Sequence, residues 1–268
     1  MPRLNQKAKT FRDFLDTTQY TDEGIRAYEW IFGENFISPG GYNENLLVLK
    51  RLGELKPDSR MLDIGVGIGG GARQAAKEFG LLVLGIDISA NMLSIAMDRL
   101  QVEKDTRIRY QICNAVDYQF PSNSFDYIVS RDGLHHNEHI DIVMKNIFKW
   151  LKPGGKALIT IYGKGHGAPK TKFQAYVENR KYHLKTLEQM VQVTKDAGFE
   201  NVQGTNLTKR LRDILIEERT RALARKGRFL EDFSEETFNS LLEGWNDKID
   251  FIDDDNQTWL QIIATKPL

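Results

Sequence analysis

The stretch that most constrains the fold of this chain is RMLDIGVGIGGGARQ, from Arg60 to Gln74. An apolar run ends there in alternating glycines and is followed by a helical pattern, which predicts a strand, a tight turn and a helix N-terminus. Gly65, Gly67 and Gly70 satisfy the GxGxxG pattern of dinucleotide-binding loops. The run GGGAR allows other registers for the third glycine, so the loop predicts a nucleotide-like ligand without identifying it.

Short apolar runs alternate with helical patterns from here on, which predicts an α/β fold with a doubly wound, Rossmann-like, mostly parallel sheet. The expected strands are 61–64, 82–86, 108–112, 127–130, 157–162, one after Gly198 and one in the final segment TWLQIIATKP. The expected helices between them are 71–78, 91–100, 140–151 and 186–197. This order puts the glycine loop at the carboxyl edge of the sheet, where such folds bind their ligands.

Three segments do not follow this alternation. Residues 1–54 are interpreted as a helical lid rich in aromatic side chains, 163–184 as an insertion with glycine and lysine, and 209–248 as a charged helical stretch. We expect one domain, divided into the lid (1–54), a cofactor-binding core (55–162) and substrate-side insertions with the final strands (163–268).

The charge balance argues against a nucleic-acid partner, because 37 Lys and Arg residues offset 37 Asp and Glu residues. The only cysteine, Cys113, cannot form an intrachain disulfide, and no apolar run approaches the roughly 20 residues of a membrane span. The first residues, MPRLNQKAKTFRDF, lack the apolar region of a secretory signal. We therefore expect a cytoplasmic monomer with a small-molecule substrate and neither a membrane span nor a metal site.

Two aspartates bear on the ligand of the glycine loop. Asp63 lies two residues before Gly65, where a carboxylate would repel a pyrophosphate but attract the ammonium and sulfonium groups of S-adenosylmethionine. Asp87 ends the second strand and could accept hydrogen bonds from ribose hydroxyls, which both kinds of cofactor carry. Asp63 therefore favours S-adenosylmethionine, and a nicotinamide oxidoreductase remains the alternative.

Four stretches between Lys56 and Tyr162 carry a family resemblance: LDIGVGIGGG, GIDIS, FDYIVSRDGLHH and WLKPGGKALIT. They resemble the motifs of class I S-adenosylmethionine-dependent methyltransferases. This resemblance implies S-adenosylmethionine as cofactor, S-adenosylhomocysteine as product, and methyl transfer rather than hydride transfer. It does not identify the methyl acceptor.

A second resemblance covers nearly the whole chain and rests on QYTDEGIRAYEWIFGENFISPGG, SRDGLHH, YVENRKY and GWNDKI. These stretches resemble the phosphoethanolamine N-methyltransferases of nematodes, malaria parasites and plants. The resemblance implies N-methylation of phosphobases, the phosphorylated ethanolamines, to give phosphocholine for phosphatidylcholine synthesis. The stretches IYGKGHG and NRKYHLK most resemble the nematode enzyme for the two later steps, on phosphomonomethylethanolamine and phosphodimethylethanolamine, and leave phosphoethanolamine itself open.

In that family a tyrosine and a histidine form a catalytic dyad, and the matching residues are Tyr20 and His136. Methyl transfer to an amine needs an unprotonated nitrogen, and an alkylammonium titrates near ~10. A histidine, with an ordinary pKa near ~6.5, could take the proton. The neighbouring His135 leaves open which imidazole acts.

The substrate match follows from the same resemblance, since a phosphate calls for cationic and phenolic donors. Among the matched residues, Asp132 would offset the positive charge of the amine, and Tyr176 and Arg180 would share one helix face. The phosphate clamp would be Tyr162, Arg180, Tyr182 and Lys248, and the further substrate residues are Tyr28, Asp132 and Tyr176.

In the cofactor match, the residue that contacts the adenine base is left open. Asn114 stands where the family usually carries an aspartate, with Asp117 three residues later, so we expect Asn114 and Ala115 to contact the base and keep Asp117 as the alternative. The other cofactor residues implied by the resemblance are Gln19, Ile37, Ser38, Asp63, Gly65, Asp87, Ile88 and Arg131.

Two alternatives remain within the methyltransferase fold. One is an enzyme acting on an apolar substrate such as a sterol, a quinone or a fatty acyl chain, whose pocket should lack the cluster of Arg180, Tyr182 and Lys248. The other is a non-catalytic S-adenosylmethionine-binding subunit, disfavoured because Tyr20 and His136 are both present. A lid should shield the reactive sulfonium from water, so we expect deletion of residues 1–38 to abolish activity while the sheet domain stays folded.

Overall fold

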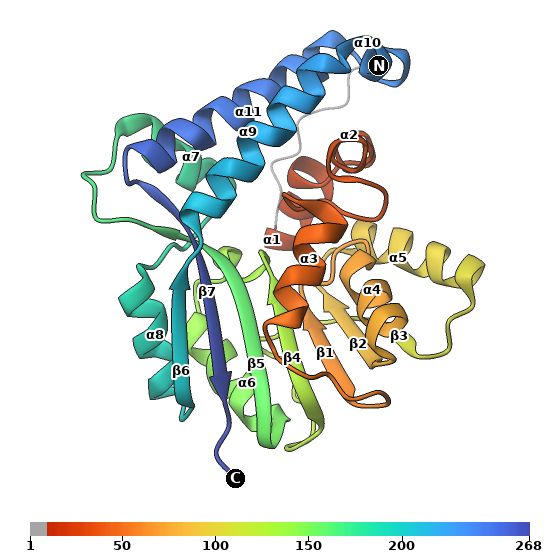
Figure 1. Cartoon of the computed structure of the whole chain (residues 1–268), viewed down its shortest axis with the longest axis vertical. Coiled ribbons are helices and arrows are strands. Elements are labelled where there is room, and N and C mark those ends of the chain that lie inside the picture. Colours follow the sequence, from red (N-terminus) through yellow and green to blue (C-terminus); the bar gives the residue numbers. More distant parts are fainter. Residues whose placement is uncertain (1–9) are drawn as a thin grey trace.

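The computed structural model describes residues 10–268, and its centre is a seven-stranded sheet in the order β3-β2-β1-β4-β5-β7-β6 (Figure 1). Strands β1 to β5 pair in parallel, whereas β7 runs antiparallel to both β5 and β6. The bounds are β1 (Arg60–Ile64), β2 (Leu82–Asp87), β3 (Ile108–Ile112), β4 (Phe125–Arg131), β5 (Leu151–Lys164), β6 (Glu200–Asn206) and β7 (Gln257–Thr265). The predicted doubly wound α/β sheet is confirmed.

Helices cover both faces of the sheet and its carboxyl edge. Their bounds are α1 (Phe11–Phe14), α2 (Asp22–Phe32), α3 (Gly41–Lys50), α4 (Gly70–Phe79), α5 (Ala90–Glu103), α6 (Ile140–Trp150), α7 (Thr171–Arg180), α8 (Leu187–Asp196), α9 (Thr208–Ala224), α10 (Lys226–Asp232) and α11 (Glu235–Asp253). A π-helical turn, η1 (Leu15–Gln19), follows α1, and a 3₁₀ turn, η2 (Leu134–His136), follows β4. In the part of the chain that the structure describes, none of these helices has the length and apolar character needed to span a membrane.

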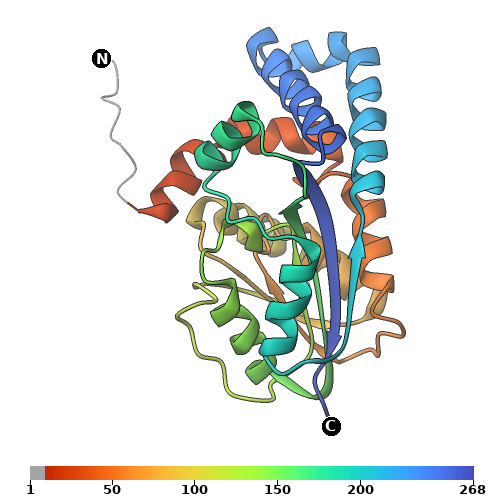
Figure 2. The same ribbon diagram turned by 90° about the vertical axis from the view of Figure 1, so that its left-hand side faces the viewer.

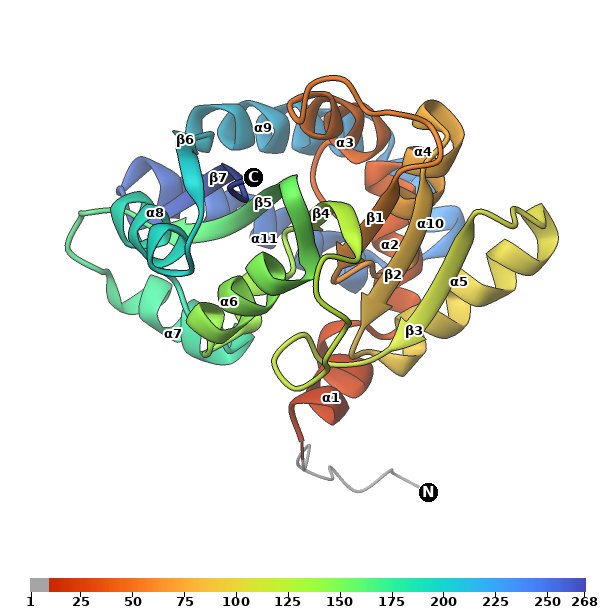
Figure 3. The same ribbon diagram turned by 90° about the horizontal axis from the view of Figure 1, so that it is seen from below.

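The core lies on both sides of the sheet because successive strand residues point to opposite faces. On β1, Leu62 and Ile64 join the cluster packed under α6 and α8, while Met61 joins the cluster packed under α3, α4 and α5. Figure 3, which looks along the strands, shows α6 and α8 on one side and α3 and α4 on the other. Both faces of the central strand β1 are therefore buried, as its apolar run predicts, whereas the edge strand β3 is partly exposed.

The ligand-binding edge is set by the strand order. From β1 the sheet grows to β2 and β3 on one side and to β4 and β5 on the other, so β1 and β4 flank the switch point. A Cβ added to Gly65, after β1, would lie 3.4 Å from the Cα of Gly133, after β4. The loops after these two strands thus meet where open α/β sheets bind ligands.

The N-terminal helices lie across this edge. Thr21 caps α2 by accepting a hydrogen bond from the Gly24 N–H at 3.2 Å. One side of α2 buries Ile25 against Ile68 and Met92 of the core, and Ile31 packs into the cluster formed by the C-terminal helices. Figure 2 shows the N-terminal helices at the same end of the sheet as α7, α9 and α11. The predicted lid therefore contacts both the core and the insertions; residues 1–9 of that call lie outside the described part.

The predicted elements differ from the structure mainly at their ends. Leu151, predicted as the last residue of a helix, begins β5 instead, because the chain extends directly after Trp150 and pairs with Phe125 of β4. The charged stretch predicted over 209–248 is helical and extends to Asp253. The insertion after β5 contains α7, which carries both Tyr176 and Arg180 as their four-residue spacing suggested, although the sequence analysis gave this helix no bounds.

Candidate functional site

The glycine loop turns sharply between β1 and α4. Gly65, Gly67 and Gly69 have φ angles of +74°, +56° and +81°, values that residues with a side chain rarely adopt. Gly69 is the residue before the helix, so the turn glycines are Gly65, Gly67 and Gly69, one of the registers that the run GGGAR leaves open. Gly70 has a different role: a Cβ there would come within 1.9 Å of the Asn35 carbonyl oxygen, so its small size lets the lid approach.

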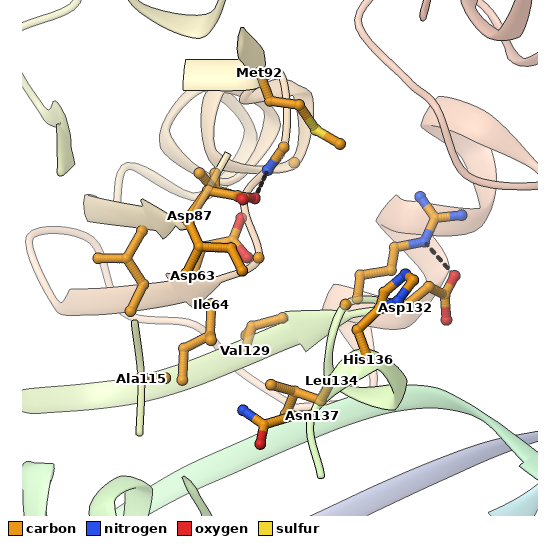
Figure 4. Close-up of a pocket in the computed structure, with 18 of the residues that line it drawn as sticks. Asp63, Ile64, Asp87, Met92, Ala115, Val129, Asp132, Leu134, His136 and Asn137 are labelled. Atoms are coloured by element: carbon orange, nitrogen blue, oxygen red, sulfur yellow. Dashed lines mark hydrogen bonds and ion pairs between the residues drawn. The ribbon is translucent and has the colours of Figure 1, made fainter. Parts of the chain in front are cut away.

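A cavity of about 360 Å³ opens beside this loop, within the range of small-molecule sites (Figure 4). Figure 4 shows Asp63 and Asp87 toward one end of it and Asp132 and His136 toward the other. All the sequence-predicted cofactor residues line the cavity except Gln19: Ile37, Ser38, Asp63, Gly65, Asp87, Ile88, Asn114, Ala115 and Arg131. Gln19 ends the π-helical turn and lies beside the Tyr20 hydroxyl, outside the cavity lining, so its predicted cofactor contact gains no support.

Two buried carboxylates give the first end of the cavity its character. Asp87 accepts hydrogen bonds from the Gly67 and Ser89 N–H groups, both at 2.9 Å, which holds its side chain at the end of β2. Asp63 is 7% exposed, and its pKa is raised to about 7 by burial and then by the charge of Asp87, with Arg131 opposing. A cationic ligand group beside Asp63 would offset the free-energy cost of ionising this buried carboxyl group and would therefore keep it ionised.

The loop after β3 places both adenine candidates at the cavity. Asn114 accepts a hydrogen bond from the Val116 N–H at 3.0 Å through Oδ1 and donates from Nδ2 to Asp117 at 3.1 Å. The Asn114 NH₂ group is therefore turned toward Asp117, which leaves a carbonyl lone pair as the acceptor for a ligand amino group.

The lid closes the cavity through a turn held by the sheet. Arg131, at the end of β4, donates to the Pro39 carbonyl at 2.6 Å and to the Gly41 carbonyl at 3.2 Å. This fixes the turn that carries Ile37 and Ser38 over the glycine loop.

Tyr20 and His136, the predicted dyad, both line the cavity. The Tyr20 backbone carbonyl accepts a hydrogen bond from Asn91 Nδ2 at 2.8 Å, which fastens it to the start of α5, and burial raises the pKa of its phenol. Burial and the charge of Arg180 lower the pKa of His136 to about 4. The backbone groups of Arg180 and Lys181 lie near the ring and oppose this shift, but neither ring nitrogen of His136 makes a hydrogen bond of normal geometry among the residues that the structure describes. The imidazole that lines the cavity is therefore neutral.

The two adjacent histidines are not equivalent. His135 is 2% exposed, does not line the cavity, and stacks on Tyr162 with ring centroids 4.8 Å apart. Its pKa is held well below the ordinary value by burial and by His136. The structure therefore favours His136 as the imidazole that meets a ligand.

The predicted phosphate residues gather directly behind His136. The Tyr182 ring lies 4.8 Å from the His136 ring, 5.6 Å from the Tyr176 ring and 6.2 Å from the Tyr162 ring. The remaining members adjoin these: Arg180 lies over Tyr176, Lys248 over Tyr162, and Tyr28 lies next to Arg180. We call this set, Tyr28, Tyr162, Tyr176, Arg180, Tyr182 and Lys248, the tyrosine–cation cluster.

Among residues 10–268, neither Arg180 nor Lys248 forms an ion pair with a carboxylate within 4.0 Å, although both are largely buried. Burial and the charge of Arg180 lower the pKa of Lys248 to about 8, with Glu218 and Asp132 opposing. The Tyr176 hydroxyl is buried without a hydrogen-bond partner in the described residues. Two positive charges beside the hydroxyl groups of Tyr176 and Tyr182 are the complement of an anion that can accept several hydrogen bonds.

Asp132 joins the cavity to the cluster. Its carboxylate Oδ1 accepts from Trp259 Nε1 at 2.8 Å and from the Thr160 hydroxyl at 2.9 Å, and Oδ2 lies 3.9 Å from Arg131 Nε. The residue lines the cavity although its side chain is only 5% exposed.

Sequence reasoning missed several residues of the site. Trp259 comes from the last strand, and no motif marks it. Glu218 is 2% exposed on α9 and accepts the Gly40 N–H at 2.7 Å, so it holds the lid turn from the side of the insertions. Asn35 and Phe36 line the cavity beside the predicted Ile37, and only their adjacency to it could have indicated them.

Comparisons with known proteins agree with this geometry. A family model described as a methyltransferase domain matches residues 62–159. Phosphoethanolamine N-methyltransferase 2 of Caenorhabditis elegans is 53% identical over 96% of this chain, and phosphoethanolamine N-methyltransferase of Plasmodium falciparum is 37% identical over 98%. A solved structure of Haemonchus contortus phosphoethanolamine N-methyltransferase 2, in complex with phosphomonomethylethanolamine and S-adenosylhomocysteine, matches 97% of the chain with a TM-score of 0.95 and 53% identity.

The lengths of these relatives differ. The chain covers 59% of the C. elegans protein and 61% of the H. contortus chain, but 99% of the P. falciparum protein. The likeness therefore includes the lid and the insertions as well as the sheet, and it spans one relative from end to end. The chain belongs to the phosphoethanolamine N-methyltransferase family, with the class I methyltransferase fold.

Proposed function

We propose that this chain catalyses S-adenosylmethionine-dependent N-methylation of phosphobases, leading to phosphocholine. The observation that carries the proposal is the position of His136, which lines the cavity beside the glycine loop and contacts Tyr182 of the tyrosine–cation cluster. A base between a cofactor cavity and an anion-binding cluster matches a substrate with an amine at one end and a phosphate at the other.

The cavity residues fit S-adenosylmethionine by their chemistry. Asp63 would accept the ammonium of the methionine moiety, Asp87 the ribose hydroxyls, and Asn114 with Ala115 would contact the adenine. Because Gly65 and Gly67 have no side chain, the turn keeps space beside the cavity that a Cβ at either position would reduce. When bound, this cofactor supplies an electrophilic methyl group on its sulfonium.

The tyrosine–cation cluster would hold the phosphate. Arg180 and Lys248 supply positive charge, and the phenols of Tyr28, Tyr176 and Tyr182 can donate to the phosphate oxygens. A sterol or a quinone carries only one or two neutral oxygens, which cannot satisfy all of these buried donors or offset two positive charges, and unpaired buried polar groups cost about 1–3 kcal/mol each. This cost is the reason that we prefer the phosphobase to the apolar alternative.

The same cluster gives His136 a way to respond to the substrate. The charge of Arg180 contributes to the lowered pKa of His136, about 4. A phosphate dianion on Arg180 would offset that charge and raise the affinity of the imidazole for a proton. We infer that His136 accepts the amine proton, that Tyr20, which lines the same cavity, helps to close the site, and that Asp132 stabilises the ammonium form before the transfer.

We assign the two later methylations to this chain, on phosphomonomethylethanolamine and phosphodimethylethanolamine. The H. contortus relative, 53% identical, was solved with phosphomonomethylethanolamine, which supports this choice. We also keep the expectation that the enzyme acts as a cytoplasmic monomer, which size-exclusion chromatography and cell fractionation would check.

The test is a methyl-transfer assay with S-adenosylmethionine and four acceptors: phosphoethanolamine, its monomethyl and dimethyl forms, and free ethanolamine. We expect turnover of the two methylated phosphobases and none of ethanolamine, which lacks the phosphate. Turnover of phosphoethanolamine as well would overturn the assignment to the later steps alone. No turnover of any phosphobase, despite S-adenosylmethionine binding, would overturn the substrate class.

A further inference from the structure

The indole of Trp259 is buried at the site and has a specific partner. Trp259 is 1% exposed, and its Nε1 donates to Asp132 Oδ1 at 2.8 Å. The hydroxyl of Thr160 donates to the same oxygen at 2.9 Å. Two neutral donors therefore occupy one carboxylate oxygen, which leaves Oδ2 as the oxygen without such a donor.

The reversed direction of β7 explains how a residue from the end of the chain reaches this place. β7 pairs antiparallel with β5, so its first residues lie at the carboxyl edge of the parallel strands, and Trp259 stands opposite Tyr162. Thr160 lies on β5 beside Arg131 of β4, next to the start of the loop that carries Asp132. The two donors therefore come from neighbouring strands, whose relative positions the sheet fixes.

The backbone of Asp132 also needs support. Its φ angle is +54°, in the left-handed region, where a residue with a side chain is strained. The Asp132 N–H donates to the Thr160 carbonyl at 2.9 Å, in addition to the two hydrogen bonds on its side chain. A strained backbone conformation persists where several surrounding contacts hold it in place, and residues of this kind concentrate at functional sites.

We propose that Trp259, with Thr160, is a positioning residue that acts through Asp132. By occupying Oδ1, the pair orients the carboxylate so that Oδ2, which lies 3.9 Å from Arg131 Nε, is left to meet the substrate ammonium. This inference rests on the proposed function. It adds to the predicted dyad of Tyr20 and His136 a positioning residue from the last strand of the sheet.

The test compares two tryptophans that differ in their hydrogen bonds. Trp259→Phe removes the donor to Asp132, whereas Trp150→Phe makes the same change at a buried tryptophan whose Nε1 has no partner in residues 10–268. We expect kcat with phosphomonomethylethanolamine to fall about tenfold or more in Trp259→Phe, as expected for a lost hydrogen bond to a charged group. The Kd of S-adenosylmethionine should not change, and Trp150→Phe should keep its kcat.

Thr160, the second donor, allows a rescue experiment, and Trp259 with Asp132 allows a double-mutant cycle. Thr160→Val should lose kcat and Thr160→Ser should keep it, because serine retains the hydroxyl. In an Asp132→Ala background, Trp259→Phe should cause no further loss, since the residue acts only through that carboxylate. Additive losses, or equal losses in Trp150→Phe and Trp259→Phe, would overturn the proposal.

A measurement without turnover separates this inference from the proposed function. The indole N–H resonance of Trp259, identified by its loss in Trp259→Phe, should shift in Asp132→Ala while the other indole resonances stay in place. An unchanged resonance would show that the hydrogen bond is absent and overturn the positioning role. A wild-type enzyme without phosphobase turnover would overturn both proposals, whereas normal turnover by Trp259→Phe would overturn this one alone.

Discussion

Asp63 is a buried carboxyl group whose charge depends on what binds beside it. Its pKa is raised from 3.8 to about 7, mainly by burial. An adjacent ammonium stabilises only the ionised form of this carboxyl group. Beside an anion such as a pyrophosphate, Asp63 would stay protonated. This is the physical reason that the site favours S-adenosylmethionine over a dinucleotide.

We expect S-adenosylmethionine binding to weaken as the pH falls through about 7, the pKa of Asp63 in the free protein. Below this pH the carboxyl group must lose a proton on binding, so Kd should rise by up to about tenfold per pH unit. Titration calorimetry from pH 8.5 to pH 5.5 measures this dependence. Asp63→Asn should bind weakly with a nearly flat profile; if it kept the slope of the wild type, another group would be responsible.

The two histidines should separate in kinetics. His136→Asn removes the imidazole that faces the cavity, and loss of a general base lowers kcat by about 100-fold or more. His135→Leu keeps an apolar group against Tyr162 and should leave kcat within about tenfold of the wild type. Steady-state assays at saturating substrate measure both, and a larger loss at His135 would reverse the assignment.

At the scale of elements, the lid is held by an ion pair between α2 and α5. Arg99 donates from both terminal nitrogens to the Glu29 carboxylate, at 2.6 and 2.8 Å, and also donates to Asn35 Oδ1 at 2.9 Å. The Asn35 N–H donates in turn to Glu29 at 2.7 Å. Since Asn35 lines the cavity, this bidentate pair connects the position of α2 to the shape of the site.

Arg99→Met should loosen the lid without unfolding the sheet. We expect the Kd of S-adenosylmethionine to rise about tenfold, because a partly buried, bidentate pair is worth more than an exposed one. Hydrogen exchange of α2 should become faster in the same variant. The control is Lys209→Met, which breaks an exposed pair with Asp213 on α9 and should change neither quantity. Unchanged exchange in Arg99→Met would mean that apolar packing alone holds the lid.

Elements with a strong repeating pattern were predictable from the sequence, and contacts between distant elements were not. The strand 108–112 was predicted with its observed bounds, because apolar residues at 108, 110 and 112 alternate with polar ones, a pattern typical of a partly exposed strand such as β3 at the edge of the sheet. The glycine loop was also found, since its φ angles require glycine. The register of the third glycine stayed open, because the pattern alone cannot separate a turn glycine such as Gly69 from Gly70, which makes room for the lid.

The residues of the candidate site fall into the same two groups, those that a local pattern predicts and those that only contacts between distant elements bring together. Asp63 and Asp87 follow from their places at strand ends, and the cavity contains both. The pairing of Asp132 with Trp259, and of Glu29 with Arg99, joins positions far apart in the chain through sheet order and helix packing. No local pattern specifies such pairs, so the sequence did not predict them.

For the whole molecule, three segments far apart in sequence meet at one edge of the sheet. Figure 2 shows the N-terminal helices, α7 and the C-terminal helices at the same end. The lid contributes Tyr20, the loop after β4 His136, and the insertions Arg180 and Lys248. The sheet has its own core beneath them, in two clusters that contain no residue of the lid helix α2.

This separation of cores leads to a prediction for a chain without residues 1–38. The sheet should stay folded with a lower melting temperature, because the deletion removes Ile25 and Ile31, whose burial is worth about 1.5–3 kcal/mol each. Turnover should be abolished, since Tyr20 is lost and the cavity is open to water. Circular dichroism and thermal melting test the fold, and the methyl-transfer assay tests activity. An unfolded truncated chain would show that lid and sheet form one cooperative unit, and retained turnover would show that the reaction does not need the lid.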